Sequence, residues 1–237
     1  AGLLVTTGIQ NTVIGGLAGD ALTSGKEHVV LGYNALGAET NGIACVAIGY
    51  EALATQNGTG AANIYNTAVG YQAGRLVTTG ISNTLVGGLA GDALTDADYN
   101  VALGESALST DTLGSRNTAI GRATLANQNF TSATNSYNTA VGYGAGSAVT
   151  TGIQNTFIGS LAGDSTDDGG FNTSVGYNSL SANCGNQNSA LGENALAQTT
   201  GATNTAIGAA AGFEVTGGNN NILVGTDAGR TGSPGGS

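Results

Sequence analysis

The chain has 237 residues, of which 42 are Gly and one is Pro, and only 8% are charged. Frequent Gly excludes a long helical bundle, because each Gly costs roughly 1 kcal/mol inside a helix. The missing Gly-X-Y period excludes collagen, and the regularly spaced apolar residues argue against disorder. A net charge of −10 makes nucleic acid and anionic membrane surfaces poor partners. No apolar run approaches the roughly 20 residues of a membrane span.

One motif is repeated along almost the whole chain. The unit Asn-Thr-Ala-(Ile/Val/Leu)-Gly-x-x-Ala-(Gly/Leu) is clearest at 66–74 and 138–146. Its central glycine recurs in steps of 16, 17 or 21, and 17 is the usual step. The positions are Gly15, Gly32, Gly49, Gly70, Gly87, Gly104, Gly121, Gly142, Gly159, Gly176, Gly192, Gly208 and Gly225. Such a fixed period is typical of a solenoid.

A longer super-repeat lies over the short one. The segment 5–9 returns at 77–81 and at 149–153, an offset of 72 each time, and residue 1 falls in the middle of a unit. We therefore expect a piece of a longer array, or copies of the chain stacked end to end. The prediction is a single solenoid over 1–229, made of thirteen coils, followed by a flexible tail or linker at 230–237.

Each unit predicts one strand just before its glycine. Counting that glycine as position zero, position −1 is always aliphatic and position −3 is nearly always β-branched. We expect these two to line the inside of the coil, because alternate residues of a strand share one face. Position −2 then faces outward, although it too is mostly apolar.

The pattern as a whole predicts an all-β fold, a parallel β-solenoid or β-roll with one coil for each repeat of the motif. The position −2 side chains are expected to pack against other copies of the chain. Residues assigned to this packing are Val13, Leu85, Phe157 and Leu223.

Position −4 is Asn in eleven of the thirteen units, with His28 and Cys45 in the other two. Identical amides one strand spacing apart can form hydrogen bonds along a stack. We therefore predict a structural Asn ladder, with His28 as a substitution within it. The ladder residues are Asn11, Asn66, Asn83, Asn100, Asn117, Asn138, Asn155, Asn172, Asn188, Asn204 and Asn221.

The motif resembles the repeats in the heads of trimeric autotransporter adhesins. It is still more similar to long arrays in phage tail-fibre-like proteins that precede an endosialidase-type chaperone domain. The resemblance implies a homotrimer of β-rolls whose position −2 faces meet on a three-fold axis, which places Val13, Leu85, Phe157 and Leu223 at that axis. The period departs from the resemblance, because it is longer than the repeat of the adhesin heads.

The residues offer little catalytic chemistry. The single histidine, His28, is already assigned to the ladder, so none remains for a catalytic triad, and one histidine cannot supply the several that a zinc site often uses. Cys45 and Cys184 are expected to be free. No enzyme activity, cofactor or metal is expected, although acidic loops at 96–98 and 167–168 leave Ca²⁺ binding open beside a solvated rim. Tyrosines at position +1 are candidate surface contacts for a cell-surface glycan. They are Tyr33, Tyr50, Tyr71, Tyr143 and Tyr177.

Two functions are weighed from these patterns. The first is a non-enzymatic structural or adhesive fibre shaft, a rigid trimeric rod located outside the cell on a virion or cell surface. The alternative is an ice-binding solenoid, in which the Asn-Thr pairs stack into rows of Thr on a flat face. The direction of the position −3 side chains discriminates the two, and the expectation that they point inward favours the fibre.

Overall fold

The computed structural model describes residues 1–58 and 62–230, and these residues form an all-β parallel solenoid. The coils have the length of the sequence repeat, since Asn83 bonds to Asn100, its equivalent on the next coil, at a sequence separation of 17. The predicted fold class is therefore confirmed. The predicted tail lies, from residue 231 on, outside the described residues.

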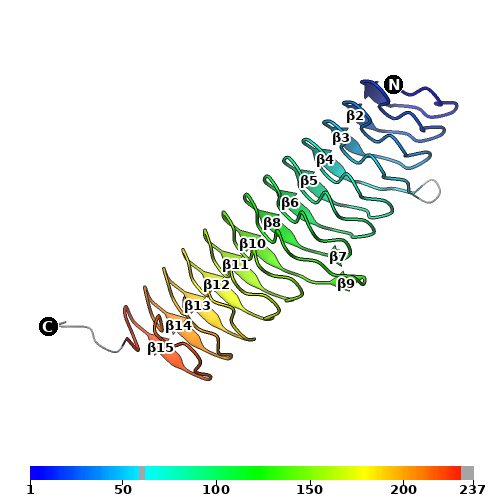
Figure 1. Cartoon of the computed structure of the whole chain (residues 1–237). Coiled ribbons are helices and arrows are strands. Elements are labelled where there is room, and N and C mark those ends of the chain that lie inside the picture. The colour runs from blue at the N-terminus through cyan, green and yellow to red at the C-terminus, as the bar shows by residue number, and fades with distance from the viewer. Residues whose placement is uncertain (59–61, 231–237) are drawn as a thin grey trace. The chain divides into compact units, whose positions relative to one another are not determined.

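The chain divides into two compact units. One is formed by 1–122 with 129–135 and the other by 123–128 with the residues from 136 on. In each unit the coils lie side by side, and every coil contributes one short strand to a sheet (Figure 1).

All strands of the first unit are parallel and in register, so Thr84 lies opposite Val101 on the next coil. A shorter parallel pair, β7 (Gly114–Ser115) and β9 (Thr134–Asn135), lies on another side of its coils. The main sheet contains β1 (Thr12–Ile14), β2 (Val29–Leu31), β3 (Val46–Ile48), β4 (Thr67–Val69), β5 (Thr84–Val86), β6 (Val101–Leu103) and β8 (Thr118–Ile120).

The second unit repeats this arrangement. Its strands are again parallel and in register, with Thr156 between Thr139 and Thr173. They are β10 (Thr139–Val141), β11 (Thr156–Ile158), β12 (Thr173–Val175), β13 (Ser189–Leu191), β14 (Thr205–Ile207) and β15 (Ile222–Val224).

The direction of the strand side chains is the reverse of the sequence expectation. Position −2 points into the coil, where Ala47, Leu85 and Phe157 are completely buried. Position −1 points outward, so that Leu103 is 45% and Ile158 41% exposed. The assignment of the position −2 residues to a trimer axis was therefore wrong. Leu85 and Phe157 lie inside the chain, and Val13 and Leu223 occupy the same inward position on their coils.

The narrow interior of the coil explains this arrangement. Where position −2 is Leu or Phe, position +4 of the same coil is Gly. A Cβ at Gly91 would lie 2.8 Å from Leu85 Cδ2, and one at Gly163 would lie 2.5 Å from Phe157 Cδ1. In other coils the sizes are reversed, and the Ala102 coil carries a buried leucine at +4, Leu108.

Three coils have small residues at both positions, and their neighbours supply the missing volume. Ala68 and Gly74 form one such pair. A Cβ at Gly74 would lie 2.6 Å from Cδ1 of Leu85 on the following coil and 2.9 Å from Cδ2 of Leu53 on the preceding one. Leucines of adjacent coils thus keep the interior filled, as close packing requires.

The central glycines fix how closely successive coils approach each other. All thirteen have φ between 119° and 143°, a region that side chains strongly disfavour. A Cβ at Gly104 would also lie 2.5 Å from the carbonyl oxygen of Gly121 on the next coil. By contrast, a Cβ at Gly88, which stands at position +1, would have no heavy atom within 4 Å.

Substitution of Gly104 by Ala tests this constraint. We expect Gly104→Ala to lower the free energy of unfolding by about 2 kcal/mol, because the backbone conformation is strained for a side chain and the neighbouring carbonyl leaves no space. Gly88→Ala is the matched control and should change stability by less than about 0.5 kcal/mol. Urea denaturation followed by circular dichroism measures both, and equal effects at the two sites would contradict the explanation.

Candidate functional site: the strand face and the tyrosine stack

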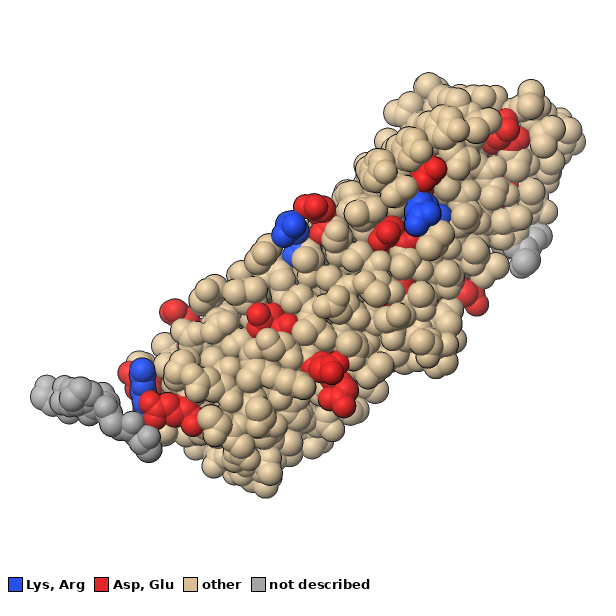
Figure 2. All heavy atoms as spheres, viewed as in Figure 1, with Lys and Arg blue, Asp and Glu red and all other residues tan. Residues whose placement is uncertain are grey.

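The outward side chains at positions −3 and −1 form a surface that we call the strand face. Within the first unit, Leu31 is 43% and Leu103 45% exposed. Within the second, Leu191 is 51% and Ile207 45% exposed. Figure 2 shows one side of the molecule, on which Lys, Arg, Asp and Glu are sparse and scattered. Such a row of half-exposed aliphatic side chains in each unit is unusual on a surface that faces only water.

Beside this aliphatic row runs the row of position −3 residues. In the first unit it mixes Thr with Val, and Val29 is 41% exposed. In the second unit five consecutive coils carry a hydroxyl in register. They are Thr139, Thr156, Thr173, Ser189 and Thr205. These hydroxyl side chains lie on the outward face of the strands, contrary to the inward direction expected from the sequence.

A hollow interrupts the strand face of the second unit between β12 and β14. Its volume is about 240 Å³. The hollow lies where Ser189, which is smaller than Thr, occupies the −3 row. It is lined by Thr173, Val175, Ser189, Ala190, Leu191, Thr205, Ala206 and Ile207. Few polar atoms line this space, so it suits an apolar side chain better than a hydrogen-bonding ligand.

The Asn residues before the strands bond one coil to the next. Asn100 is completely buried, and its Oδ1 accepts the backbone N–H of Asn117 at 2.9 Å. Its Nδ2 donates to the carbonyl oxygen of Gly114 at 3.0 Å. Asn204 in the second unit makes the same pair of bonds, to the N–H of Asn221 at 3.0 Å and to the carbonyl oxygen of Gly218 at 2.8 Å. These two amides thereby satisfy backbone groups that would otherwise be buried without a partner.

His28 takes the place of an Asn in this ladder and makes equivalent bonds. Its Nδ1 accepts the N–H of Cys45 at 3.1 Å, and its Nε2 lies 2.9 Å from the carbonyl oxygen of Gly42. The ring is therefore neutral with the proton on Nε2, because a carbonyl can only accept. Burial lowers the pKa of His28, although the Gly42 carbonyl and the carboxylates of Glu39 and Glu27 oppose the shift.

Backbone N–H groups of the two coils that carry an insertion donate hydrogen bonds to buried carboxylates. The sequence patterns did not indicate these carboxylates. Glu39 is completely buried, and its Oε2 accepts the N–H of Gly58 at 3.0 Å. Asp111 has the same role one super-repeat later, since its Oδ1 accepts the N–H of Phe130 at 3.1 Å. The signal in the sequence is that the two acids stand at the same place in successive super-repeats, each one coil before an insertion.

The structure brings three of the five candidate tyrosines together. The ring of Tyr50 stacks on Tyr33 with centroids 5.5 Å apart and on Tyr71 with centroids 5.4 Å apart. Tyr143 and Tyr177 are exposed on the second unit, where Ser160 occupies the coil between them. The neighbouring carboxylate of Glu51 is the main cause that raises the pKa of Tyr50.

The sequence patterns did not indicate a second set of exposed aromatic residues. Tyr65, Tyr99, Tyr137 and Phe171 stand at position −5 and are between 48% and 56% exposed. The guanidinium of Arg116 lies 4.7 Å from the ring centroid of Tyr99. Position −5 varies too much between units for the repeat alone to indicate a shared surface.

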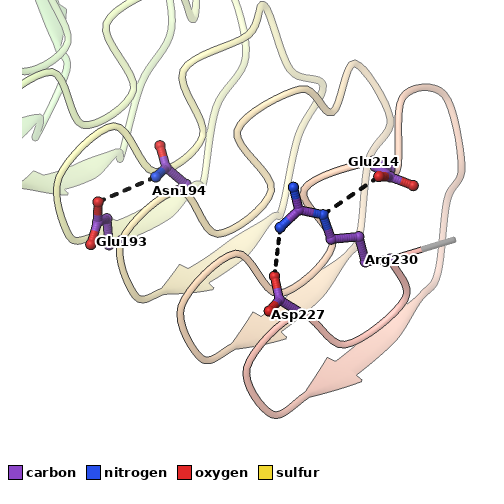
Figure 3. A network of polar contacts seen from close by, with 5 residues as sticks. All are labelled: Glu193, Asn194, Glu214, Asp227 and Arg230. Atoms are coloured by element: carbon purple, nitrogen blue, oxygen red, sulfur yellow. Dashed lines mark hydrogen bonds and ion pairs between the residues drawn. The ribbon is translucent and has the colours of Figure 1, made fainter. Parts of the chain in front are cut away.

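Charged residues of the last coils are paired with one another. Arg230 contacts Asp227 at 2.8 Å and Glu214 at 3.6 Å, and Glu193 accepts a hydrogen bond from Asn194 (Figure 3). Among the described residues no group of three or more His, Cys, Asp or Glu side chains is placed to hold a metal ion. The two cysteines are buried and free. No helix in the described part of the chain could cross a membrane.

No model of a known protein family matches the chain, and neither the curated proteins nor the solved structures contain one that is similar to it. The functional argument therefore depends on the strand face, the tyrosine stack and the bonds that position them.

The His28 ring predicts a loss of stability in mild acid. The folded pKa lies below the ordinary value of 6.5, so the unfolded chain binds a proton first as the pH falls. Stability should therefore be complete above pH 6.5 and decrease below it, by up to about 1.4 kcal/mol per pH unit, until the folded ring also protonates. Urea midpoints between pH 7.5 and 5 measure this decrease.

His28→Asn is the control for this prediction, because Asn is the usual ladder residue and can make both bonds without titrating. The variant should be less sensitive to acid than the unmodified chain over the same range. An identical pH profile for the two proteins would show that His28 is not the cause.

Proposed function

We propose that the chain is a non-enzymatic structural segment of an extracellular fibre, in which copies associate through their strand faces. The single observation that carries this proposal is that each unit has an outward aliphatic row, with Leu31 and Leu103 in the first unit and Leu191 and Ile207 in the second. Covering a half-exposed Leu or Ile removes roughly 80 Å² of apolar surface from water and contributes about 2 kcal/mol. Several such residues along one face supply a substantial driving force for association.

The regular spacing of the rows suits association between identical copies. Every coil presents one −1 and one −3 side chain, and successive coils are about 4.8 Å apart in a sheet. Two copies therefore have matching periods, so side chains of one can lie between side chains of the other along the whole face. A closed ring of three copies covers the face of each chain, and the trimer expected from the motif remains our proposal with the strand face, not position −2, at the axis.

Support for a location outside the cell comes from composition. The chain contains no Met and no Trp, which lowers its susceptibility to oxidation. Because each coil contacts only its neighbours, stability is approximately a sum of coil and interface terms. This additive stability allows a long fibre to be built from many coils. We therefore propose a role like that of the shafts of tail fibres and surface adhesins.

Solution mass tests the proposal. Light scattering on a size-exclusion column should give three times the chain mass of 22.9 kDa. The double variant Leu103→Asp with Ile158→Asp should shift the mass toward that of a monomer, because charges on the strand face cannot be buried without partners. Tyr65→Asp with Phe171→Asp is the control, since these residues are at least as exposed but stand at position −5, outside the rows at positions −3 and −1. A folded monomer of the unmodified chain would contradict the proposal.

A second candidate function, ice binding, is favoured by one observation. The hydroxyl row from Thr139 to Thr205 points outward and is in register over five coils. The sequence argument against ice binding relied on these side chains pointing inward, and that argument no longer holds. A regular row of hydroxyl and methyl groups can order water at the spacing of the coils, provided that the face is free of other copies.

Thermal hysteresis separates the two candidates. If the strand face is covered by other copies, the freezing point of a solution should equal its melting point. If the chain binds ice, a gap between the two should appear and Thr156→Lys should abolish it, because a long charged side chain interrupts the row. Tyr65→Lys, at position −5 and so outside the hydroxyl row, is the control that should retain the gap.

A further inference from the structure

The tyrosine stack ends abruptly at a glycine. Position +1 carries Tyr33, Tyr50 and Tyr71 on three successive coils of the first unit and Gly88 on the coil that follows. Tyr50 covers one ring face of Tyr71. The position that a fourth ring would occupy has no side chain, and a Cβ at Gly88 would have no heavy atom within 4 Å.

The two ends of the stack differ. At the first end a Cβ on Gly16 would lie 3.5 Å from Cδ2 of Tyr33, so this ring leans over the glycine before it. At the other end nothing approaches Gly88, and Tyr71 is the most exposed of the three rings at 55%, compared with 49% for Tyr33 and 43% for Tyr50. The lean of the stack therefore leaves the outer face of Tyr71 open.

A charged pair follows beyond the open position. Glu105 occupies position +1 on the coil after Gly88, and its Oε2 accepts a bond from Nε of Arg122 at 2.9 Å. The coils of Tyr71 and Glu105 are two strand spacings apart, or about 10 Å. That distance leaves room for one ring stacked on Tyr71, with a hydrogen-bond acceptor and a donor on its other side.

We propose that Tyr71, Gly88 and the Glu105–Arg122 pair form a subsite for one pyranose ring of a neutral polysaccharide. The apolar C–H face of a sugar packs on the open aromatic ring, while its hydroxyls donate to Glu105 and accept from Arg122. Planar stacking on one face with a few polar groups on the rim is the usual chemistry of an orienting site. The net charge of −10 disfavours sulfated or other anionic glycans.

The proposal does not depend on self-association, because position +1 lies after the strand and off the strand face. It also differs from a general contact by all five exposed tyrosines. Tyr33 and Tyr50 act here only by holding Tyr71 in place, and Tyr143 and Tyr177 have no part.

Affinity electrophoresis of the full chain in native gels tests the subsite. The probes are mannan, dextran and hydroxyethyl cellulose, with dextran sulfate as the anionic comparison. We expect at least one neutral probe to retard the protein. Tyr71→Ala should weaken that binding by about tenfold through loss of the stacking surface, and Tyr71→Phe should retain it.

Gly88→Leu is the sharper variant, because it removes no group and instead fills the open position over the ring. The φ angle of Gly88 is not in the left-handed region and its surroundings are open, so the substitution should leave the circular dichroism spectrum unchanged while weakening retardation as much as Tyr71→Ala. Tyr65→Ala, a loss of an equally exposed ring elsewhere, should have no effect.

Three results would overturn the proposal. They are no retardation by any neutral probe, retardation by dextran sulfate alone, and retardation that Tyr71→Ala and Gly88→Leu leave unchanged or that Tyr65→Ala reduces equally.

Discussion

The width of the coil interior is the constraint on which the rest of this structure depends. No coil places a Leu or Phe at both position −2 and position +4, and where one is large the other is smaller. Phe157 with Gly163 and Ala102 with Leu108 are two solutions of the same volume requirement. The backbone at position +4 is left-handed in both cases, with φ of 61° at Gly163 and 54° at Leu108. A leucine in that conformation costs roughly 1–2 kcal/mol, which the filled interior offsets.

A narrow interior also removes backbone N–H and C=O groups from contact with water. The Asn ladder supplies hydrogen-bond partners to such groups. A buried carbonyl or N–H without a partner costs about 1–3 kcal/mol, and each amide provides both a donor and an acceptor at the coil-to-coil spacing. His28 shows that the requirement is for the bonds and not for the amide itself, since an imidazole with one proton satisfies it. Glu39 and Asp111 extend the same logic to the two longer coils, where extra N–H groups need acceptors.

The functional surfaces follow from the same geometry. Because position −2 fills the interior, positions −1 and −3 must face outward, and a short strand therefore becomes an exposed row of aliphatic and hydroxyl groups. The in-register stacking that aligns these rows also aligns the rings of Tyr33, Tyr50 and Tyr71. One repeat thus produces two kinds of surface, a strand face suited to other copies of the chain and an aromatic row that ends in an open ring.

The sequence by itself determined the parallel solenoid, the coil length and the strand positions, because these follow from the regular spacing of the repeated motif. It also placed the Asn residues at equivalent points of the coils. The direction of the strand side chains was decided by tertiary structure, since −1, −2 and −3 are nearly all apolar or β-branched and alternation gives no sign of which side is inside. The side chains at positions −2 and +4 vary inversely in size, as in Leu85 with Gly91, and this relation indicates that position −2 points into the coil. Recognising them as neighbours required the fold of the coil, which alone brings these two positions together across its interior.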